Sequence, residues 1–213
     1  KTLVAKPDML FGKRGKNGLV LFKDAKPGDV KLEKAASWID EKSSEKQAVY
    51  FSFDGDEPTG EPSVDMLTHF VVEPFTPHEQ EEEYYVSATC VGDDDVIYMS
   101  AEGGMEVEEG WDEKVTEVAF PITATEEEIA EKIRANVPAD VADKDKEAFA
   151  ELCIGFFKAY RELNFAYLEI NPFVMQGNKI ELLDMVAKLD DTAGFMMVDA
   201  WGDVEYPTAF GME

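Results

Sequence analysis

The apolar positions of the chain predict helices in three places. Between residues 149 and 163 they recur every three or four residues, which is the spacing of one buried helix face. A second helix is predicted to begin after Thr125, because Thr125 and Glu128 have the spacing of a capping box. A third is predicted over 30–43, where aliphatic and small residues again have helical spacing. The stripe of the first helix consists of Phe149, Leu152, Cys153, Phe156, Phe157, Tyr160 and Leu163.

Strands are predicted where short apolar runs stand between turn residues. These runs are 3–6, 19–22, 48–53, 69–75 and 114–122, together with a hairpin whose arms are 83–91 and 96–100. The acidic segment 54–63 is expected to be a surface loop. Because strands outnumber helices and neighbouring strands read as antiparallel, the pattern indicates an α+β fold. The composition changes after Phe75, which suggests two subdomains, 1–75 and 76–213.

A further predicted hairpin carries polar residues on a mostly apolar pattern. If Gly177 and Asn178 form its turn, the numbers of facing residues add to 355, and Asn171 lies opposite Asp184. Glu169, two positions earlier, shares their face. Opposed side chains have Cβ atoms about 5 Å apart, so an amide and a carboxylate there can both reach one Mg²⁺. The alternative is that the pair only bonds backbone, or each other, at a strand end.

The amino-acid composition argues against some classes of binding partner. The 213 residues are 45% hydrophobic and include 14 Phe and 3 Trp, which is enough for a substantial core. The net charge of −26 makes nucleic acid and anionic membrane surfaces poor partners. No apolar run has the length of a membrane span, and no signal-peptide pattern opens the chain. Cys90 and Cys153 are expected to be small buried thiols in a reducing cytoplasm.

Basic residues are unusually frequent at the start of this acidic chain. The loop 12–18, GKRGKNG, combines them with glycines that let backbone N–H groups approach an anion. It lacks the spacing of a Walker A loop. We expect a small anionic ligand here, with Lys6 at a strand end directed at a phosphate; the alternative is a flexible basic loop. Against the single acid Asp8, the first 23 residues contain Lys1, Lys6, Lys13, Arg14, Lys16 and Lys23.

The end of the predicted strand 69–75 offers a third element of a nucleotide site. Pro74 and Thr76 stand where backbone N–H and C=O groups can meet an adenine edge. Glu83, farther along, can accept hydrogen bonds from ribose hydroxyls, as a carboxylate does in dinucleotide-binding folds. An ordinary strand and loop is the alternative. The segment 102–104, EGG, is another place where backbone can approach closely.

Other site chemistries find little support in the sequence. His69 and His78 have no Cys or His companion at zinc spacing. The acidic segment 54–65 has Thr59 where an EF-hand loop needs glycine. No G-x-S-x-G nucleophile motif is present.

Six segments together resemble the ATP-citrate lyase family, in its ATP-grasp portion, which is similar to the β subunit of succinyl-CoA synthetase. The match runs from one end of the chain to the other and is loose at 23–64 and 121–148. It implies an ATP-grasp fold, with two α+β subdomains and a nucleotide cleft between them. In order, the segments are LVAKPDMLFGKRGKNGLV, VVEPFTPHEQEEEYYV, EGGMEVEEGWDEKV, LNFAYLEINPFV, LLDMVAKLDD and WGDVEYPTAFG.

The resemblance also implies roles for individual residues. Lys6 matches the phosphate-contacting lysine, and Arg14 and Gly15 match residues of the glycine-rich loop. Pro74 and Thr76 fall on the linker that contacts adenine through its backbone, and Glu83 falls on the ribose carboxylate. Thr76 stands where a valine is expected in animal enzymes, which matters little for a backbone contact. Asn171 and Asp184 match the magnesium ligands.

The family's reaction implies further cofactors and partners. It consumes ATP, citrate and CoA and yields acetyl-CoA and oxaloacetate through phosphohistidine and citryl-CoA. Neither histidine here sits in a matching motif, so no catalytic residue is assigned to this chain. We expect ATP and Mg²⁺ as ligands and a cytoplasmic location. CoA-ligase and citrate-synthase-like domains or subunits are expected as partners in a homo- or hetero-oligomer. Since the chain begins with Lys1 and stops at FGME, we expect it to be a nucleotide-binding fragment.

Three alternatives stay open. Citryl-CoA synthetase resembles this family and makes citryl-CoA without cleaving it. The β subunit of succinyl-CoA synthetase usually has the loop GGRGKAGG, whereas this chain has GKRGKNG. A non-catalytic assembly module would use the acidic surface and the hairpin only to dock partner domains.

Overall fold

The computed structural model describes residues 2–22, 29–104, 107, 111–177, 179–203, 206 and 209–211. The chain divides into two compact units. The first unit is Lys1–Pro77 together with Glu205–Glu213, and the second is His78–Val204. Each unit contains both helices and strands, so the α+β expectation is confirmed.

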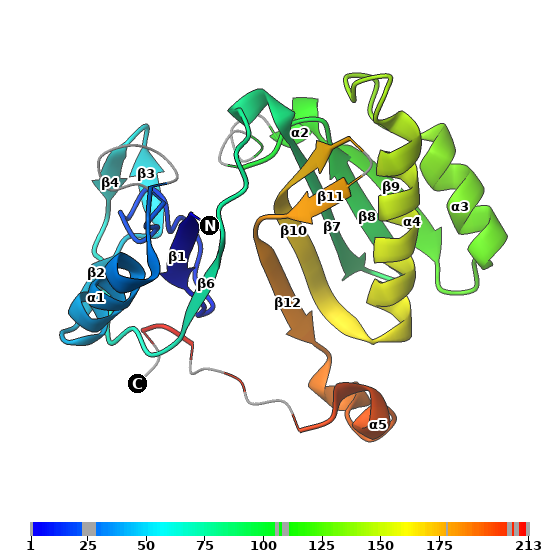
Figure 1. The fold of residues 1–213 in the computed structure, drawn as a ribbon. Helices are drawn as coiled ribbons and strands as arrows, with labels where there is room; N and C mark the ends of the chain where they lie inside the picture. Colours follow the sequence, from blue (N-terminus) through cyan, green and yellow to red (C-terminus); the bar gives the residue numbers. More distant parts are fainter. Residues whose placement is uncertain are drawn as a thin grey trace. The chain divides into compact units, whose positions relative to one another are not determined.

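The second unit is built on one antiparallel sheet of six strands (Figure 1). The strand order is β11-β10-β7-β8-β9, and β12 also pairs with β10. Helices α3 (Glu126–Ala135) and α4 (Lys146–Glu162) cover one face of this sheet (Figure 1). Its strands are β7 (Glu83–Val91), β8 (Asp94–Ser100), β9 (Thr116–Pro121), β10 (Phe165–Gln176), β11 (Lys179–Leu182) and β12 (Met185–Leu189). Its short helices are η1 (Gln80–Glu82), α2 (Trp111–Lys114), η3 (Asp191–Ala193) and α5 (Val198–Trp201).

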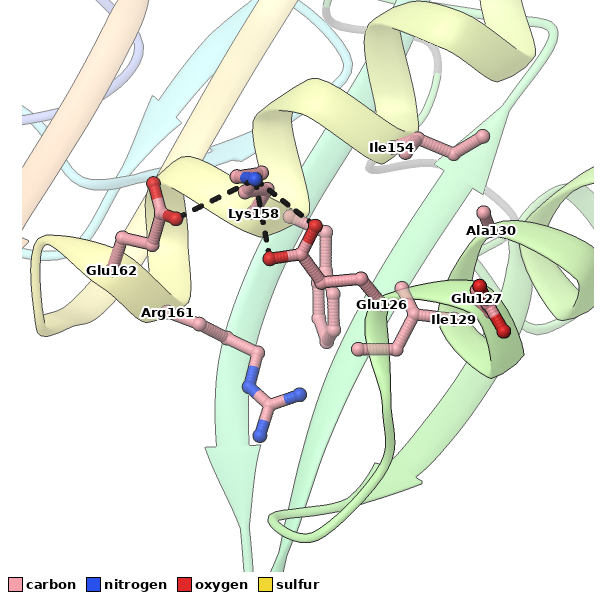
Figure 2. A pocket seen from close by; sticks show the side chains of 9 residues that line it. Glu126, Glu127, Ile129, Ala130, Ile154, Lys158, Arg161 and Glu162 are labelled. Carbon is pink, nitrogen blue, oxygen red and sulfur yellow. Dashed lines mark hydrogen bonds and ion pairs between the residues drawn. The ribbon is translucent and has the colours of Figure 1, made fainter.

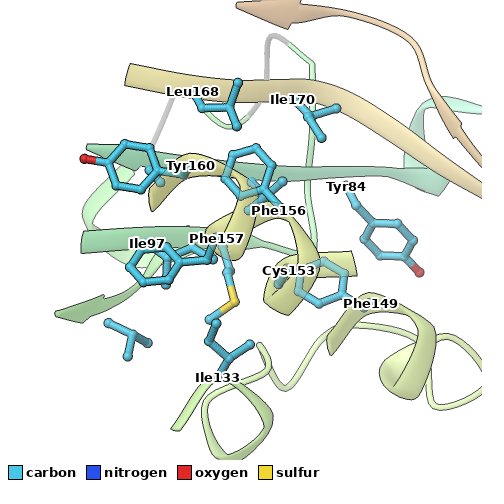
Figure 3. Packing of buried hydrophobic residues seen from close by; sticks show 14 of the residues in the cluster. Tyr84, Ile97, Ile133, Phe149, Cys153, Phe156, Phe157, Tyr160, Leu168 and Ile170 are labelled. Carbon is cyan, nitrogen blue, oxygen red and sulfur yellow. The ribbon is translucent and has the colours of Figure 1, made fainter. Parts of the chain in front are cut away.

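The predicted apolar stripe of α4 packs on the sheet (Figure 3). Five of its members are buried, and Leu152 packs against them partly buried. Phe157 lies 5.0 Å, between ring centroids, from Phe120 of β9. The capping box predicted at the start of α3 is also present, since the Thr125 hydroxyl accepts from the Glu128 N–H and the Glu128 carboxylate accepts from the Thr125 N–H. Helix packing therefore determines which sheet face is the core.

In its described residues, the first unit contains three two-stranded sheets and one long helix, α1 (Leu32–Ser43). The pairs are β1 (Leu3–Pro7) with β6 (Phe70–Pro74), β2 (Gln47–Val49) with β5 (Ser63–Asp65), and β3 (Ser52–Asp54) with β4 (Glu57–Thr59). The chain's tail belongs to this unit and not to residues 76–213 as expected. Phe210 packs on Phe11, with ring centroids 5.0 Å apart, and the Gly211 N–H donates to the Asp65 carboxylate at 3.1 Å.

Several predicted strands differ from the observed ones. Residues 19–22 form only an isolated bridge, Ala5 with Leu21. The run 48–53 breaks at Tyr50, because the Asn17 side chain bonds both the N–H and the C=O of Tyr50 in place of a neighbouring strand. The expected loop 54–63 contains β4. Lys114, the first residue of the fifth run, is the last residue of α2, and the strand begins only at Thr116.

The cysteine prediction is half right. Cys153 is fully buried in α4, and burial raises the pKa of its thiol. Cys90 is exposed, because it lies near the end of β7, next to the turn at Gly92, where the core no longer covers the strand. Both thiols are free. Among the described helices, none combines the length and the apolar character needed to cross a bilayer.

Tyr84 gives the fold a testable pH dependence. Its hydroxyl donates to Asp145 Oδ2 at 3.0 Å, and burial together with this carboxylate raises the pKa of Tyr84 to about 12. The folded state therefore holds a proton that the unfolded chain releases near pH 10. The stabilisation is fully present below pH 10 and is lost as the pH rises towards about 12.

We expect Tyr84→Phe to lower the free energy of unfolding by about 1–3 kcal/mol at pH 8, because Asp145 loses a donor. The difference from the unsubstituted protein should shrink steadily between about pH 10 and 12. Urea unfolding across this range measures it. Tyr206→Phe, at an exposed position, is the matched control. A difference that does not change with pH would contradict the assigned linkage.

Candidate functional site

The sheet face away from α3 and α4 is polar. Tyr84, Val86 and Ala88 of β7 belong to the helix-packed core, so Tyr85 and Ser87 lie on the other face. Both are buried. The ring of Trp111 from α2 packs there, 5.6 Å between centroids from Tyr85. A face that carries polar groups under partial cover is where a ligand site can be built.

A bulge places Asn171 at a special position on β10. In the ladder with β7, Ile170 faces Val86 and Phe173 faces Tyr84. Asn171 and Pro172 therefore lie together opposite the single residue Tyr85. Bulges of this kind redirect side chains and are frequent beside functional sites.

The register of β10 with its other neighbours is the one predicted from the turn. Facing residues in the β11 ladder add to 355, as in Gln176 with Lys179, and so do most pairs in the β12 ladder, as in Ile170 with Met185. Gly177 has a positive φ, while Asn178, the other turn residue, lies outside the described residues. The Asn171 N–H donates to the Asp184 carbonyl at 2.9 Å. Asn171 and Asp184 are thus opposed across the two strands.

Gly104 lies between two of the proposed ligand-binding residues. Its N–H donates to Asn171 Oδ1 at 2.7 Å. A Cβ at Gly104 would stand 2.3 Å from Glu83 Oε2, so the Glu83 carboxylate lies directly against this glycine. The other oxygen of Glu83, Oε1, lies 3.0 Å from His78 Nε2. Glu83 and Asn171 are therefore gathered around one turn of the second unit.

Glu169 has tyrosine partners. Its Oε2 accepts a hydrogen bond from the Tyr167 hydroxyl at 2.5 Å and lies 3.1 Å from the Tyr85 hydroxyl. Burial and the Glu169 carboxylate raise the pKa of both phenols. The tyrosines therefore stay protonated, and able to donate to Glu169, to a higher pH than an ordinary phenol.

The donor set at Asn171 and Asp184 fits a magnesium ion that also binds phosphate. One amide oxygen and one carboxylate are hard oxygen ligands, and Mg²⁺ commonly takes one or two protein groups plus substrate phosphates. Asp184 Oδ1 also accepts from the Met185 N–H at 3.0 Å. Within the described part of the chain, no three His, Cys, Asp or Glu side chains come together as a metal cluster. The pair would need a nucleotide to complete the coordination.

In the first unit, Lys6 and Arg14 lie at the carboxyl end of β1. Lys6 is buried, and its Nζ lies 3.0 Å from Glu73 Oε1 on the paired strand β6. Arg14 Nη1 donates to the Pro7 carbonyl at 2.8 Å, which ties the loop to the end of β1. Two of the predicted phosphate-binding cations are thus placed at one strand end.

The other predicted residues of this unit are Gly15, in the glycine-rich loop, and Pro74 and Thr76, at and after the end of β6. A Cβ at Gly15 would meet nothing within 4 Å, so packing does not require glycine there. Pro74 is exposed at the end of β6, where it pairs with Leu3 of β1. Thr76, in the linker that follows, is half-buried. Lys16 donates to the Gly55 carbonyl at 3.0 Å.

The predicted site residues are divided between the two units. Lys6, Arg14, Gly15, Pro74 and Thr76 belong to the first unit, and Glu83, Asn171 and Asp184 belong to the second. Within the second unit the structure brings Glu83 and Asn171 to Gly104 and sets Asn171 opposite Asp184. Their ligand roles remain predictions.

A cavity of about 540 Å³ opens elsewhere, between α3 and α4 (Figure 2). Ile129, Ile154 and Phe157 give it apolar walls. Lys158 at its rim is paired with Glu126 and Glu162. None of the predicted ligand-binding residues lines this cavity, so its size alone does not make it the nucleotide site.

Sequence reasoning missed several residues of the polar face. The sequence gives His78 neither a zinc site nor a phosphohistidine motif, and Tyr85 and Tyr167 have only the pattern of strand residues. Glu169 was placed on the correct strand without its partners. The EGG motif was the one available signal, because adjacent glycines mark a close backbone approach.

Comparison with known proteins identifies relatives along the whole chain. The model of the family described as ATP-citrate synthase ATP-grasp domain matches residues 1–201. ATP-citrate synthase alpha chain protein 3 of Arabidopsis thaliana is 36% identical over 210 residues, which are 98% of this chain and 44% of that protein. Human ATP-citrate synthase is 33% identical over 215 residues, covering 100% of this chain and 18% of that protein.

Solved structures show the same fold. The ATP citrate lyase of Methanothrix soehngenii, in complex with citrate and coenzyme A, superposes with a TM-score of 0.76 at 32% identity, over 100% of this chain and 44% of that one. A dinucleotide-forming acetyl-coenzyme A synthetase of Ca. Korarchaeum cryptofilum, in complex with coenzyme A and Mg-AMPPCP, has a TM-score of 0.55 at 16% identity and covers 89% of this chain and 77% of that one. This second likeness concerns the fold alone.

The chain spans less than half the length of the plant and animal relatives described above. The family model nevertheless covers nearly all of it, and the fold agrees with that of a solved ATP citrate lyase. The chain belongs to the family of ATP-citrate synthase ATP-grasp domains.

Proposed function

We propose that this chain binds Mg·ATP as the nucleotide-binding part of an ATP-citrate lyase. In that role it would hold the ATP whose phosphoryl group passes to a histidine and then activates citrate for reaction with CoA. The histidine that is phosphorylated, the CoA-ligase part and the citrate-synthase-like part would belong to other domains or subunits. A cytoplasmic location is included in the proposal, supported by the two free cysteines.

One observation carries the proposal: Asn171 and Asp184 stand opposite each other, with the Asn171 N–H bonded to the Asp184 carbonyl at 2.9 Å. A half-buried carboxamide opposite a half-buried carboxylate offers two hard oxygen ligands, which are a suitable partial shell for a hard cation. Membership of the ATP-citrate synthase ATP-grasp family supports the proposal for the chain as a whole.

The chain's own residues would bind and orient the nucleotide. Glu83 would accept hydrogen bonds from the ribose hydroxyls, with His78 holding its other oxygen. Lys6 and Arg14 would offset phosphate charge, and the backbone at Pro74 and Thr76 would meet the adenine edge. Bound Mg²⁺, held by Asn171 and Asp184, would offset charge on the transferred phosphoryl group. Such positioning and charge compensation account for most of the catalysis of phosphoryl transfer.

Nucleotide-dependent stabilisation tests the proposal directly. We expect Mg·ATP at 100 times its dissociation constant to stabilise the chain by about 2.7 kcal/mol. In a chain of this size, each kcal/mol raises the midpoint of thermal unfolding by about 2–4 °C. Mg²⁺ without nucleotide should have a much smaller effect, because two protein ligands leave the shell incomplete. An unchanged midpoint with Mg·ATP would contradict nucleotide binding and favour an assembly module.

Asp184 should be essential for phosphoryl transfer in the complete enzyme. We expect Asp184→Ala to reduce phosphohistidine formation from radiolabelled ATP by at least about 100-fold, because a group that holds compensating charge is lost. Its circular dichroism and thermal unfolding should be unchanged. Asp93→Ala, in the exposed β7–β8 turn, is the control for removal of a carboxylate. Normal phosphohistidine formation in Asp184→Ala would remove Asp184 from the site.

A further inference from the structure

We infer that the Gly103–Gly104 turn is a positioning element that couples the ribose end of the nucleotide site to its metal end. The inference rests on the proposed function, because it takes Glu83 as the ribose carboxylate and Asn171 as a metal ligand. It adds a role for residues that do not themselves touch the nucleotide in that proposal.

Gly104 touches both ends of the proposed site. Its N–H donates to Asn171 Oδ1 at 2.7 Å. Its α-carbon lies so close to Glu83 that an added Cβ would stand 2.3 Å from Oε2. The residue also has a φ of +65°, a conformation that other residues rarely adopt. The backbone conformation therefore favours glycine here, and a side chain at this position would displace the Glu83 carboxylate.

Gly103 fixes the turn against the two strands that carry these residues. A Cβ at Gly103 would lie 2.7 Å from the Tyr84 carbonyl oxygen and 2.8 Å from Pro172 Cβ. Tyr84 follows Glu83 on β7, and Pro172 follows Asn171 on β10. The turn therefore packs closely against both strands where the β10 bulge begins.

This arrangement holds both ligand groups in place. One oxygen of Glu83 lies 3.0 Å from His78 Nε2, and the other lies against Gly104. The amide oxygen of Asn171 has two lone pairs, of which one takes the Gly104 N–H and the other can take a cation. A displacement of Gly104 changes the space beside Glu83 and the orientation of Asn171 together, so the binding of nucleoside and of Mg²⁺ with phosphates must be coupled.

The first experiment compares Gly104→Ala with Gly92→Ala. Gly92, in the β7–β8 turn of the same unit, has a φ of +64°, and a Cβ there would meet nothing within 4 Å. The two variants carry the same backbone strain and differ in the clash with Glu83. We expect Gly104→Ala to weaken Mg·ATP binding at least about tenfold by isothermal titration. Gly92→Ala should bind within about twofold of the unsubstituted chain. Equal affinities in the two variants would overturn the inference.

The second experiment tests coupling without the metal and does not depend on the folding of Gly104→Ala. Adenosine, titrated in the presence of EDTA, probes only the adenine and ribose end. We expect Asn171→Ala to weaken adenosine binding about fivefold, because Gly104 loses its acceptor. Asn171→Asp keeps an oxygen that accepts from the Gly104 N–H, so it should retain adenosine affinity. A purely metal-binding role for Asn171 predicts no effect on adenosine, and that result would overturn the inference.

Failure of the proposed function would be distinct from failure of the coupling. If the unsubstituted chain binds neither Mg·ATP nor adenosine, the proposed function itself is wrong, and the inference falls with it. If the unsubstituted chain binds both and Asn171→Ala leaves adenosine affinity unchanged, the function stands and only the coupling is wrong.

Discussion

Packing of α4 on the antiparallel sheet is the interaction on which the rest of the second unit depends. The stripe that includes Phe149, Phe156 and Phe157 defines one sheet face as core (Figure 3). Because side chains alternate along a strand, this choice also fixes which residues reach the opposite face. Val86 and Ala88 enter the core, and Tyr85 and Ser87 are left for the polar face. The position of the candidate site thus follows from helix packing far from it.

The alternation of side chains along the strands does not by itself bring the candidate site residues together. The bulge in β10 gives Asn171 the position that this requires. A regular ladder would pair Asn171 with Tyr85 and give it no special position. The register shift against β7 lets Asn171 and Pro172 share the place of one residue, while the register against β12 is kept. Asn171 consequently has Gly104 as a side-chain partner and Asp184 as a backbone partner. A local irregularity is therefore where three separate segments of the chain meet.

Much of this fold could be predicted from the sequence, because its strongest patterns are local. The α4 stripe, the α3 capping box and the 355 register depend on residues within about one helix or hairpin, where periodicity and turn chemistry decide. Two of the failures involve contacts between distant segments. Asn17 interrupts the strand at Tyr50, 33 positions away, and Phe210 returns to Phe11. Neither contact leaves a periodic signal.

In the candidate site, too, the arrangement within one hairpin could be predicted from the sequence, whereas contacts between distant segments could not. Asn171 and Asp184 belong to one hairpin, so turn arithmetic placed them opposite each other without further information. The contacts of Glu83 with His78 and Gly104 depend on how η1, β7 and the EGG segment come together, which no local pattern specifies. The Tyr85–Glu169 contact spans 84 positions. A motif could mark these residues as candidates, but only the fold assigns their partners.

The charge of the chain limits how a nucleotide could be bound. A net charge of −26 opposes the approach of a triphosphate, yet exposed charges act only over about 8 Å at physiological ionic strength. Contact groups therefore decide the outcome. Lys6 is buried beside Glu73, with Nζ and Oε1 3.0 Å apart, so part of its charge is already offset. In the proposed function a phosphate must compete with Glu73 for Lys6, which leaves Arg14 and the bound Mg²⁺ to offset most of the phosphate charge. In the proposed function, Arg14 and the proposed metal ligands Asn171 and Asp184 should therefore control nucleotide affinity more than Lys6 does.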